Sequence, residues 1–150
     1  MSKATRQEKI YLTAKANIGD KSWAKNSSRQ AKRNEHVFFC AGEWKCNLFV
    51  YEVILKAGYN IGCPNRTINP FKDSELIFEF KIFRPPTTHD WYNNKIPCFR
   101  FIGEGQNGKN KMQNGDIITD NTHMGIVSYN YDEKKYFTIN AGEFKVGFND

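Results

Sequence analysis

The segment Lys45–Val53, KCNLFVYEV, decides how the rest of this 150-residue chain is interpreted. It opens a stretch whose apolar residues recur at three- and four-residue spacing: Phe49, Val50, Val53, Ile54 and Ala57. This spacing predicts a helix over residues 46–57, ended by Gly58, because glycine readily adopts the left-handed conformation that closes a helix. Cys46 would then lie in the first turn, where the partial positive charge of a helix N-terminus favours a thiolate.

The chain before this helix is expected to hold one further helix and a long loop. The apolar pattern of residues 6–18 predicts a helix that ends at Gly19 and Asp20. Residues 22–34 are polar and basic, and we expect a loop there with a short helical piece around Trp23. Residues 37–39 then lead into a turn at 41–43.

The last third of the chain has the pattern of an antiparallel sheet. Alternating apolar residues and turn signals predict strands at 116–119, 123–129 and 136–141, with a further strand at 144–148. The region 62–97 holds all five prolines, so we expect an irregular connection that shapes a binding surface, with a strand or short helix at 76–83. Helices followed by an antiparallel sheet predict a single α+β domain over residues 1–150.

The composition fits a folded, basic domain. Hydrophobic residues make up 39% of the chain, which suffices for a core, and the net charge is +6. We interpret the basic residues between positions 21 and 33 as a solvated surface, and the alternative is attraction to a polyanion such as a bacterial cell wall. Because the chain has no nucleic-acid-binding motif and no apolar run of bilayer length, neither a nucleic-acid partner nor a membrane span is expected.

The chain order of Cys46 and His123 suggests a thiol nucleophile and its base. His123 begins a predicted strand after a tight turn at 120–122, so its ring can face a neighbouring helix end. Asn140 lies on the next strand and is our candidate for orienting the imidazole, because neighbouring antiparallel strands place side chains side by side. Asp116 is the runner-up, although we expect it to hold the backbone of its Gly-Asp turn. The backbone amide of Cys46 would supply an oxyanion donor.

Taken singly, these residues have ordinary explanations. A cysteine in an apolar helix most often packs in the core, and a histidine at a strand edge most often lies on the surface. The spacing of the four cysteines contains no paired CxxC motif, so no zinc site, other metal or cofactor is expected. We expect Cys40, Cys63 and Cys98 to be small buried apolar residues.

At these residues the sequence resembles the NlpC-type and CHAP-type cell-wall cysteine peptidases. The resemblance lies in KCNLFVYEV at 45–53 and in GDII at 115–118 followed by HMGIVS at 123–128. It extends to GDKSWA at 19–24 and PPTTHDW at 85–91, and it spans roughly Ala14 to Gly142. The resemblance implies a papain-like fold and cleavage of amide bonds in peptidoglycan.

Carried over residue by residue, the resemblance makes Cys46 the nucleophile, His123 the base and Asn140 the third polar residue. The family's usual Asp-Cys-Ser-Gly signature is absent, because Lys45 and Asn47 flank the cysteine, and this leaves the subfamily and the cleaved bond open.

The substrate side of the expected site comes from three further residues. Trp23 and Trp91 are expected to line the groove, with core packing as an equally weighted alternative, and His89 is assigned to the structural or substrate side. His36 is interpreted in the same way as His89.

The expected partners are peptidoglycan or its stem peptides and, for an antibacterial toxin, a cognate immunity protein. The N-terminus has no apolar secretion core, so we expect synthesis in the cytoplasm without a cleavable signal peptide, and delivery by phage lysis or a specialised secretion machine. Two alternatives stay open: a non-catalytic wall-binding module of the same fold, and a thiol acyltransferase or deamidase that acts on protein.

Overall fold

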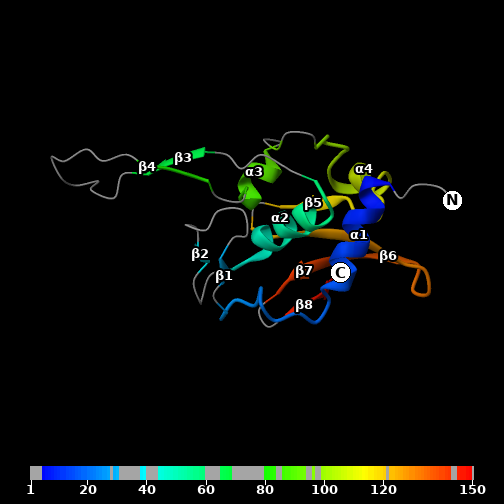
Figure 1. Ribbon diagram of the computed structural model, residues 1–150. Helices are drawn as coiled ribbons and strands as arrows, with labels where there is room; N and C mark the ends of the chain where they lie inside the picture. Colours follow the sequence, from blue (N-terminus) through cyan, green and yellow to red (C-terminus); the bar gives the residue numbers. More distant parts are fainter. Residues whose placement is uncertain are drawn as a thin grey trace.

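The computed structural model describes residues 5–27, 29–30, 38–39, 44–59, 65–68, 80–83, 86–93, 96, 99–120, 122–142 and 145–149. Its elements are, in chain order, α1 (Arg6–Ala16), β1 (Arg29–Gln30), β2 (Phe38–Phe39), α2 (Cys46–Lys56), β3 (Asn65–Ile68), β4 (Phe80–Phe83), α3 (Thr88–Tyr92), α4 (Gly105–Lys109), β5 (Ile117–Thr119), β6 (Met124–Asn130), β7 (Lys135–Ala141) and β8 (Val146–Asn149). Strands β5 to β8 form an antiparallel sheet in sequence order, and α1 and α2 pack against it (Figure 1). The expected α+β class is confirmed.

Helix α2 forms as the apolar spacing predicts, with both ends close to those expected. It begins at Cys46 and ends at Lys56, and Gly58 follows with a φ of 96°. Its buried residues run without a break from Leu48 to Ile54, so the helix is enclosed on nearly all sides. Burial of this kind explains why α2 is stable although no side chain caps its first turn.

Helix α1 is fixed at its start by a capping box. Thr5 Oγ1 accepts from the Glu8 amide at 3.1 Å, and Glu8 Oε2 accepts from the Thr5 amide at 2.9 Å. These two bonds satisfy backbone donors that the first turn leaves open. The helix ends at Ala16, two residues earlier than expected, and Gly19 follows with a φ of 91°.

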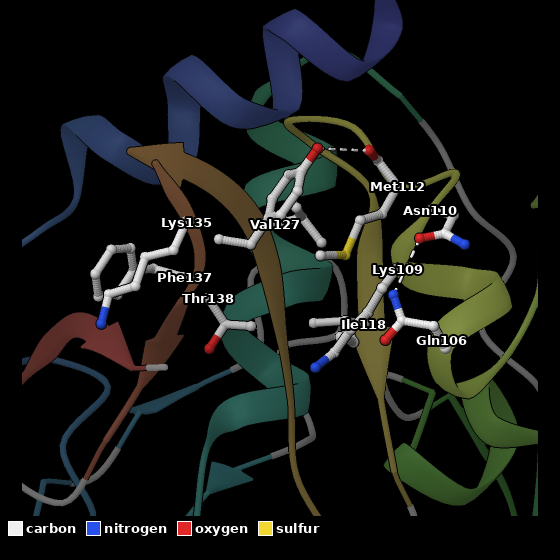
Figure 2. Close-up of a pocket in the computed structure, with 10 residues that line it drawn as sticks. Gln106, Lys109, Asn110, Met112, Ile118, Val127, Lys135, Phe137 and Thr138 are labelled. Carbon is white, nitrogen blue, oxygen red and sulfur yellow. Dashed lines mark hydrogen bonds between the residues drawn. The ribbon is translucent and has the colours of Figure 1, made fainter. Parts of the chain in front are cut away.

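The two faces of the sheet differ in what covers them. Ile126 on β6 pairs with Ile139 on β7, and both belong to the core beneath α1 and α2. Side chains alternate along a strand, so the neighbouring residues Val127 and Thr138, which are also paired, lie on the opposite face. There they line a cavity of about 510 Å³ beside α4, together with Ile118 (Figure 2).

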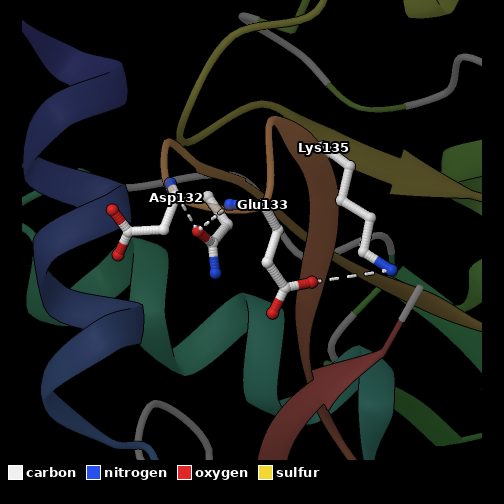
Figure 3. Close-up of polar contacts among 4 residues, drawn as sticks. Asp132, Glu133 and Lys135 are labelled. Carbon is white, nitrogen blue, oxygen red and sulfur yellow. Dashed lines mark hydrogen bonds and ion pairs between the residues drawn. The ribbon is translucent and has the colours of Figure 1, made fainter.

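The turn between β6 and β7 is held by a single side chain. Asn130 Oδ1 accepts from the amides of Asp132 and Glu133 at 2.9 and 3.0 Å (Figure 3). Glu133 and Lys135 form an ion pair at 3.7 Å between exposed side chains, an arrangement that contributes little to stability. The expected hairpin is therefore confirmed, and the geometry of its turn depends mainly on Asn130.

Several expectations were less accurate or lie outside the described residues. The helical piece around Trp23 is wrong: residues 21–27 form successive turns, in which the amides of Ala24 and Ser27 bond three residues back. Within the expected element at 76–83, β4 is a strand over Phe80–Phe83 that pairs with β3, and 76–79 are not described. The turn at 41–43 and the residues His36, Cys40, Cys63 and Cys98 are outside the described residues. None of the helices in the described part of the chain has the length and apolar character that a bilayer span requires.

Candidate functional site

Cys46 is the first residue of α2, as expected, and its side chain is 4% exposed. The residues that follow it, Leu48, Phe49 and Val50, are fully buried in the core. The thiol therefore has a fixed place at the end of a helix that cannot shift without disturbing that core. A fixed nucleophile is what a covalent mechanism requires.

Lys45, immediately before the thiol, is a buried anchor. Its side chain is 1% exposed, and its Nζ donates to the backbone carbonyls of Ala24 and Lys25, both at 3.0 Å. Ammonium groups are rarely buried, and one that is buried must have hydrogen-bond acceptors around it. Lys45 therefore ties the start of α2 to the turns at 21–27, a role that its charge alone did not reveal in the sequence.

The backbone of β6 presents an amide to the thiol. The amides of His123 and Val127 point toward β5, since they donate to Asp120 Oδ1 and to the Asp116 carbonyl, both at 2.8 Å. Successive amides alternate along a strand, so the amide of Met124 points the other way, toward β7. The paired register of β6 and β7 ends at Ile126 and Ile139, and beyond it the Met124 amide lies near enough to the Cys46 thiol to lower its pKa.

Burial raises the pKa of Cys46 above its ordinary value, and the charge of Asp120 adds to this effect, whereas we expected the helix N-terminus to lower it. The backbone amides of Met124, Asn47 and Cys46 do lower the pKa, as expected of a helix N-terminus. Desolvation outweighs these amides, so the environment favours the neutral thiol.

His123 precedes Met124, whose amide acts on the Cys46 thiol, so His123 lies at the end of the sheet near the start of α2. It closes a tight hairpin: the Asp120 amide donates to the His123 carbonyl at 3.0 Å. The side chain is partly exposed, so the ring is accessible to solvent and to a substrate. Among the described residues, no hydrogen bond joins the imidazole to Cys46 or to Asn140, so the structure does not bring these three side chains together.

Asn140 lies on the strand next to His123, as expected, and is 1% exposed. Its side-chain nitrogen donates to Thr138 Oγ1 at 2.9 Å. On one side it faces Gly125, where an added Cβ would lie 3.1 Å from the Cβ of Asn140. The small residue at 125 therefore makes room for Asn140 between strands. Asp116 holds its own turn, as expected, because its Oδ2 accepts from the Gln113 amide at 2.8 Å.

The segment that carries Trp91 and His89 is attached to the nucleophile helix. Asn47 Nδ2 donates to the Pro86 carbonyl at 3.2 Å, and α3 begins two residues later. Trp91 is 7% exposed, with its ring edge-on to Phe99 at 4.9 Å, and its indole N–H has no hydrogen-bond partner within the described chain. Trp91 therefore packs in the core, which was the equally weighted alternative for this residue, while His89 is exposed.

Trp23 belongs to the core. It is 5% exposed, its Nε1 donates to Glu52 Oε2 at 2.9 Å, and its ring packs edge-on against Phe49 at 5.3 Å. Of the two roles that the sequence left open for this residue, core packing is the one that the structure supports. Its influence on the site is indirect, through the position of α2.

Trp44 is the aromatic residue that the sequence analysis overlooked. It lies two residues before Cys46, its side chain is 51% exposed, and the Lys25 ammonium lies 4.7 Å from its ring centroid. A large exposed ring beside a nucleophile provides a face for a sugar ring or a peptide, and the neighbouring cation can attract a carboxylate. Its position next to the cysteine was the signal in the sequence.

No group of His, Cys, Asp and Glu side chains suited to a metal ion occurs among the described residues. The cavity of Figure 2 lies on the sheet face away from Ile126 and Ile139, so it is not the thiol site.

No protein-family model, curated protein or solved structure matches this chain. The functional argument therefore depends on the site itself: an α+β domain with a buried thiol at a helix start and a histidine one residue before the strand amide that acts on that thiol.

Proposed function

We propose that the protein is a papain-like thiol hydrolase of the NlpC or CHAP type that cleaves a peptide amide in peptidoglycan. The observations that carry this proposal are the place of Cys46 at the start of α2 and the influence of the Met124 amide, next to His123, on its thiol. They bring the thiol to the residue next to His123, as a nucleophile and its base require. The resemblance of KCNLFVYEV and HMGIVS to these peptidases points to the same chemistry.

The reaction follows from a protonated thiol beside a base. His123 accepts the thiol proton as the sulfur of Cys46 bonds to the amide carbonyl carbon. The C–N bond then breaks, and the amine leaves with the proton from His123. Water, deprotonated by His123, hydrolyses the thioester and releases the acid and the free thiol. The amides of Cys46 and Met124 lie at the sulfur and are the candidate donors to the oxyanion.

Substrate contacts are assigned to Trp44, which supplies an exposed ring beside the nucleophile. Such a ring suits a glycan-linked peptide, since sugars stack on aromatic rings. The net charge of +6 favours approach to an anionic wall.

The test is digestion of purified sacculi by the wild-type protein and by Cys46→Ala, with the new termini identified by mass spectrometry. We expect soluble fragments with new peptide amines from the wild type and none from Cys46→Ala. Cys98→Ala is the matched control, because it removes a different thiol, and it should digest as the wild type does. Equal release by wild type and Cys46→Ala would refute the catalytic assignment.

The two alternatives give different results in the same experiment. A wall-binding module would co-sediment with sacculi and release nothing in either form. A thiol acyltransferase or deamidase acting on protein would leave sacculi intact while its Cys46 still forms a thioester with an activated acyl donor, which mass spectrometry detects as an added acyl mass on the peptide of residue 46.

A further inference from the structure

The hairpin between β5 and β6 places one carboxylate against the base of the proposed site. Asp120 and His123 are cross-strand partners, joined by the bond from the Asp120 amide to the His123 carbonyl at 3.0 Å. Asp120 Oδ1 also accepts from the amide of His123 at 2.8 Å and from the amide and hydroxyl of Thr122 at 2.7 and 2.9 Å. The carboxylate therefore fixes the backbone from which the imidazole projects.

We propose that Asp120 is the charged positioning residue for His123, a role that the sequence analysis gave to Asn140. This inference rests on the proposed thiol mechanism. An amide such as that of Asn140 carries no charge, so it cannot stabilise an imidazolium as a carboxylate can. Asp120 carries that charge, and its other carboxylate oxygen, Oδ2, is used by none of the hydrogen bonds among the described residues.

The electrostatics of the hairpin agree with this role. The amides of Thr122 and His123 hold the pKa of Asp120 below its ordinary value, and the charge of His123 adds to the effect. The carboxylate is therefore ionised in the hairpin that carries His123, so it can hold the backbone amides there as a charged acceptor. The same carboxylate disfavours the Cys46 thiolate and so raises the pKa of that thiol.

The other charged groups near the thiol come from different elements. The ammonium of Lys45, on the residue before α2, is directed to the carbonyls of Ala24 and Lys25. On the α3 side, Asp90 is engaged in a capping box with Thr87, and His89 is exposed. Asp120 is the carboxylate among these groups whose charge acts on the Cys46 thiol.

The two effects of Asp120 have opposite consequences, and this makes the role testable. Asp120→Asn keeps an oxygen acceptor for the Thr122 and His123 amides but removes the charge. We expect Cys46 to react with iodoacetamide about two- to fivefold faster at pH 7, the range typical of one partly solvated charge. We expect the turnover number kcat on sacculi to fall about fivefold or more, because the backbone that carries His123 loses the charged acceptor that holds it.

Asp116→Asn is the matched control, since it removes a carboxylate from the other end of β5. It should leave both the labelling rate of Cys46 and kcat within about twofold of the wild type. Labelling is followed by mass spectrometry of the peptide that contains residue 46, which separates Cys46 from the other three cysteines. A purely structural role for Asp120 would lower labelling and turnover together or change neither, and either result overturns the proposal.

The proposal can still be tested if the variant does not fold or if sacculi are not the substrate. If Asp120→Asn fails to fold, labelling of the wild type in 0.05 M and 1 M salt replaces it, because salt screens an exposed charge. Faster labelling at high salt supports the proposal, and an unchanged rate overturns it. If the wild type does not digest sacculi, the proposed substrate is wrong, whereas the labelling comparison still decides whether Asp120 acts on the thiol and its base.

Discussion

The two glycines that flank Asn140 allow a sharp test of how the candidate site is built. Asn140 on β7 lies opposite Gly147 on β8 and next to Gly125 on β6. A Cβ added at Gly125 would lie 3.0 Å from the Ile139 carbonyl oxygen and 3.1 Å from the Cβ atoms of Asn140 and Thr138. A Cβ added at Gly147 would meet nothing within 4 Å.

The expected magnitudes follow from these contacts. Neither glycine has a positive φ, so alanine at either position brings the usual gain of about 0.4–1 kcal/mol from a less flexible unfolded chain. At Gly125 the crowding costs about 1–3 kcal/mol more than it does at an open position. We therefore expect Gly125→Ala to destabilise the protein by about 1–2 kcal/mol and Gly147→Ala to stabilise it slightly.

The assay is urea unfolding followed by tryptophan fluorescence, with thermal unfolding as a second measure. In a chain of this size about 1 kcal/mol moves the Tm by about 2–4 °C, so the two variants should differ clearly. Gly125→Ala should also reduce sacculus digestion more than Gly147→Ala does, because it distorts β6 two residues after His123. Equal stability of the two variants would refute the close strand approach at Gly125.

Three further predictions concern the anchors and the pH dependence of the site. Lys45→Met should destabilise the protein by about 2–4 kcal/mol, because two carbonyls lose a charged donor, and urea unfolding should show this. Trp23→Phe should destabilise the protein by about 1–3 kcal/mol, because it removes the hydrogen-bond donor to buried Glu52. Trp44→Phe should destabilise it less, because the side chain of residue 44 is half exposed. The pKa of Cys46 is raised in the folded protein, so its neutral thiol favours folding and that contribution is lost as the pH rises through the thiol range. Cys46→Ser should therefore flatten the fall in unfolding free energy between about pH 8 and pH 10, and an unchanged slope would contradict the buried thiol.

The local elements were predictable because their signals are local. The helix expected at 46–57 is observed at 46–56, and the strands expected at 123–129 and 136–141 are observed at 124–130 and 135–141. Spacing of apolar residues and a glycine stop are properties of short segments, so they do not depend on how segments pack. The positions of Cys46 at a helix start and of His123 at a strand start were predictable for the same reason, because both depend only on these local elements.

The properties that depend on packing were not predictable. The helix N-terminus was expected to ionise Cys46, but the degree of burial depends on the whole core, and burial raises the pKa of the thiol instead. Lys45 gave no sign of burial, because its carbonyl partners lie about 20 residues earlier in the chain. Asp120 was assigned only to a turn, since a sequence does not show which way a hairpin carboxylate turns.

The end of the β6–β7 ladder has a consequence for how the protein can be observed. The amide of Met124 lies where that ladder has ended, and it acts on the Cys46 thiol. A group attached to the sulfur would change the surroundings of this amide. Its exchange with deuterated solvent is therefore a probe of the covalent state of Cys46 that needs no substrate label.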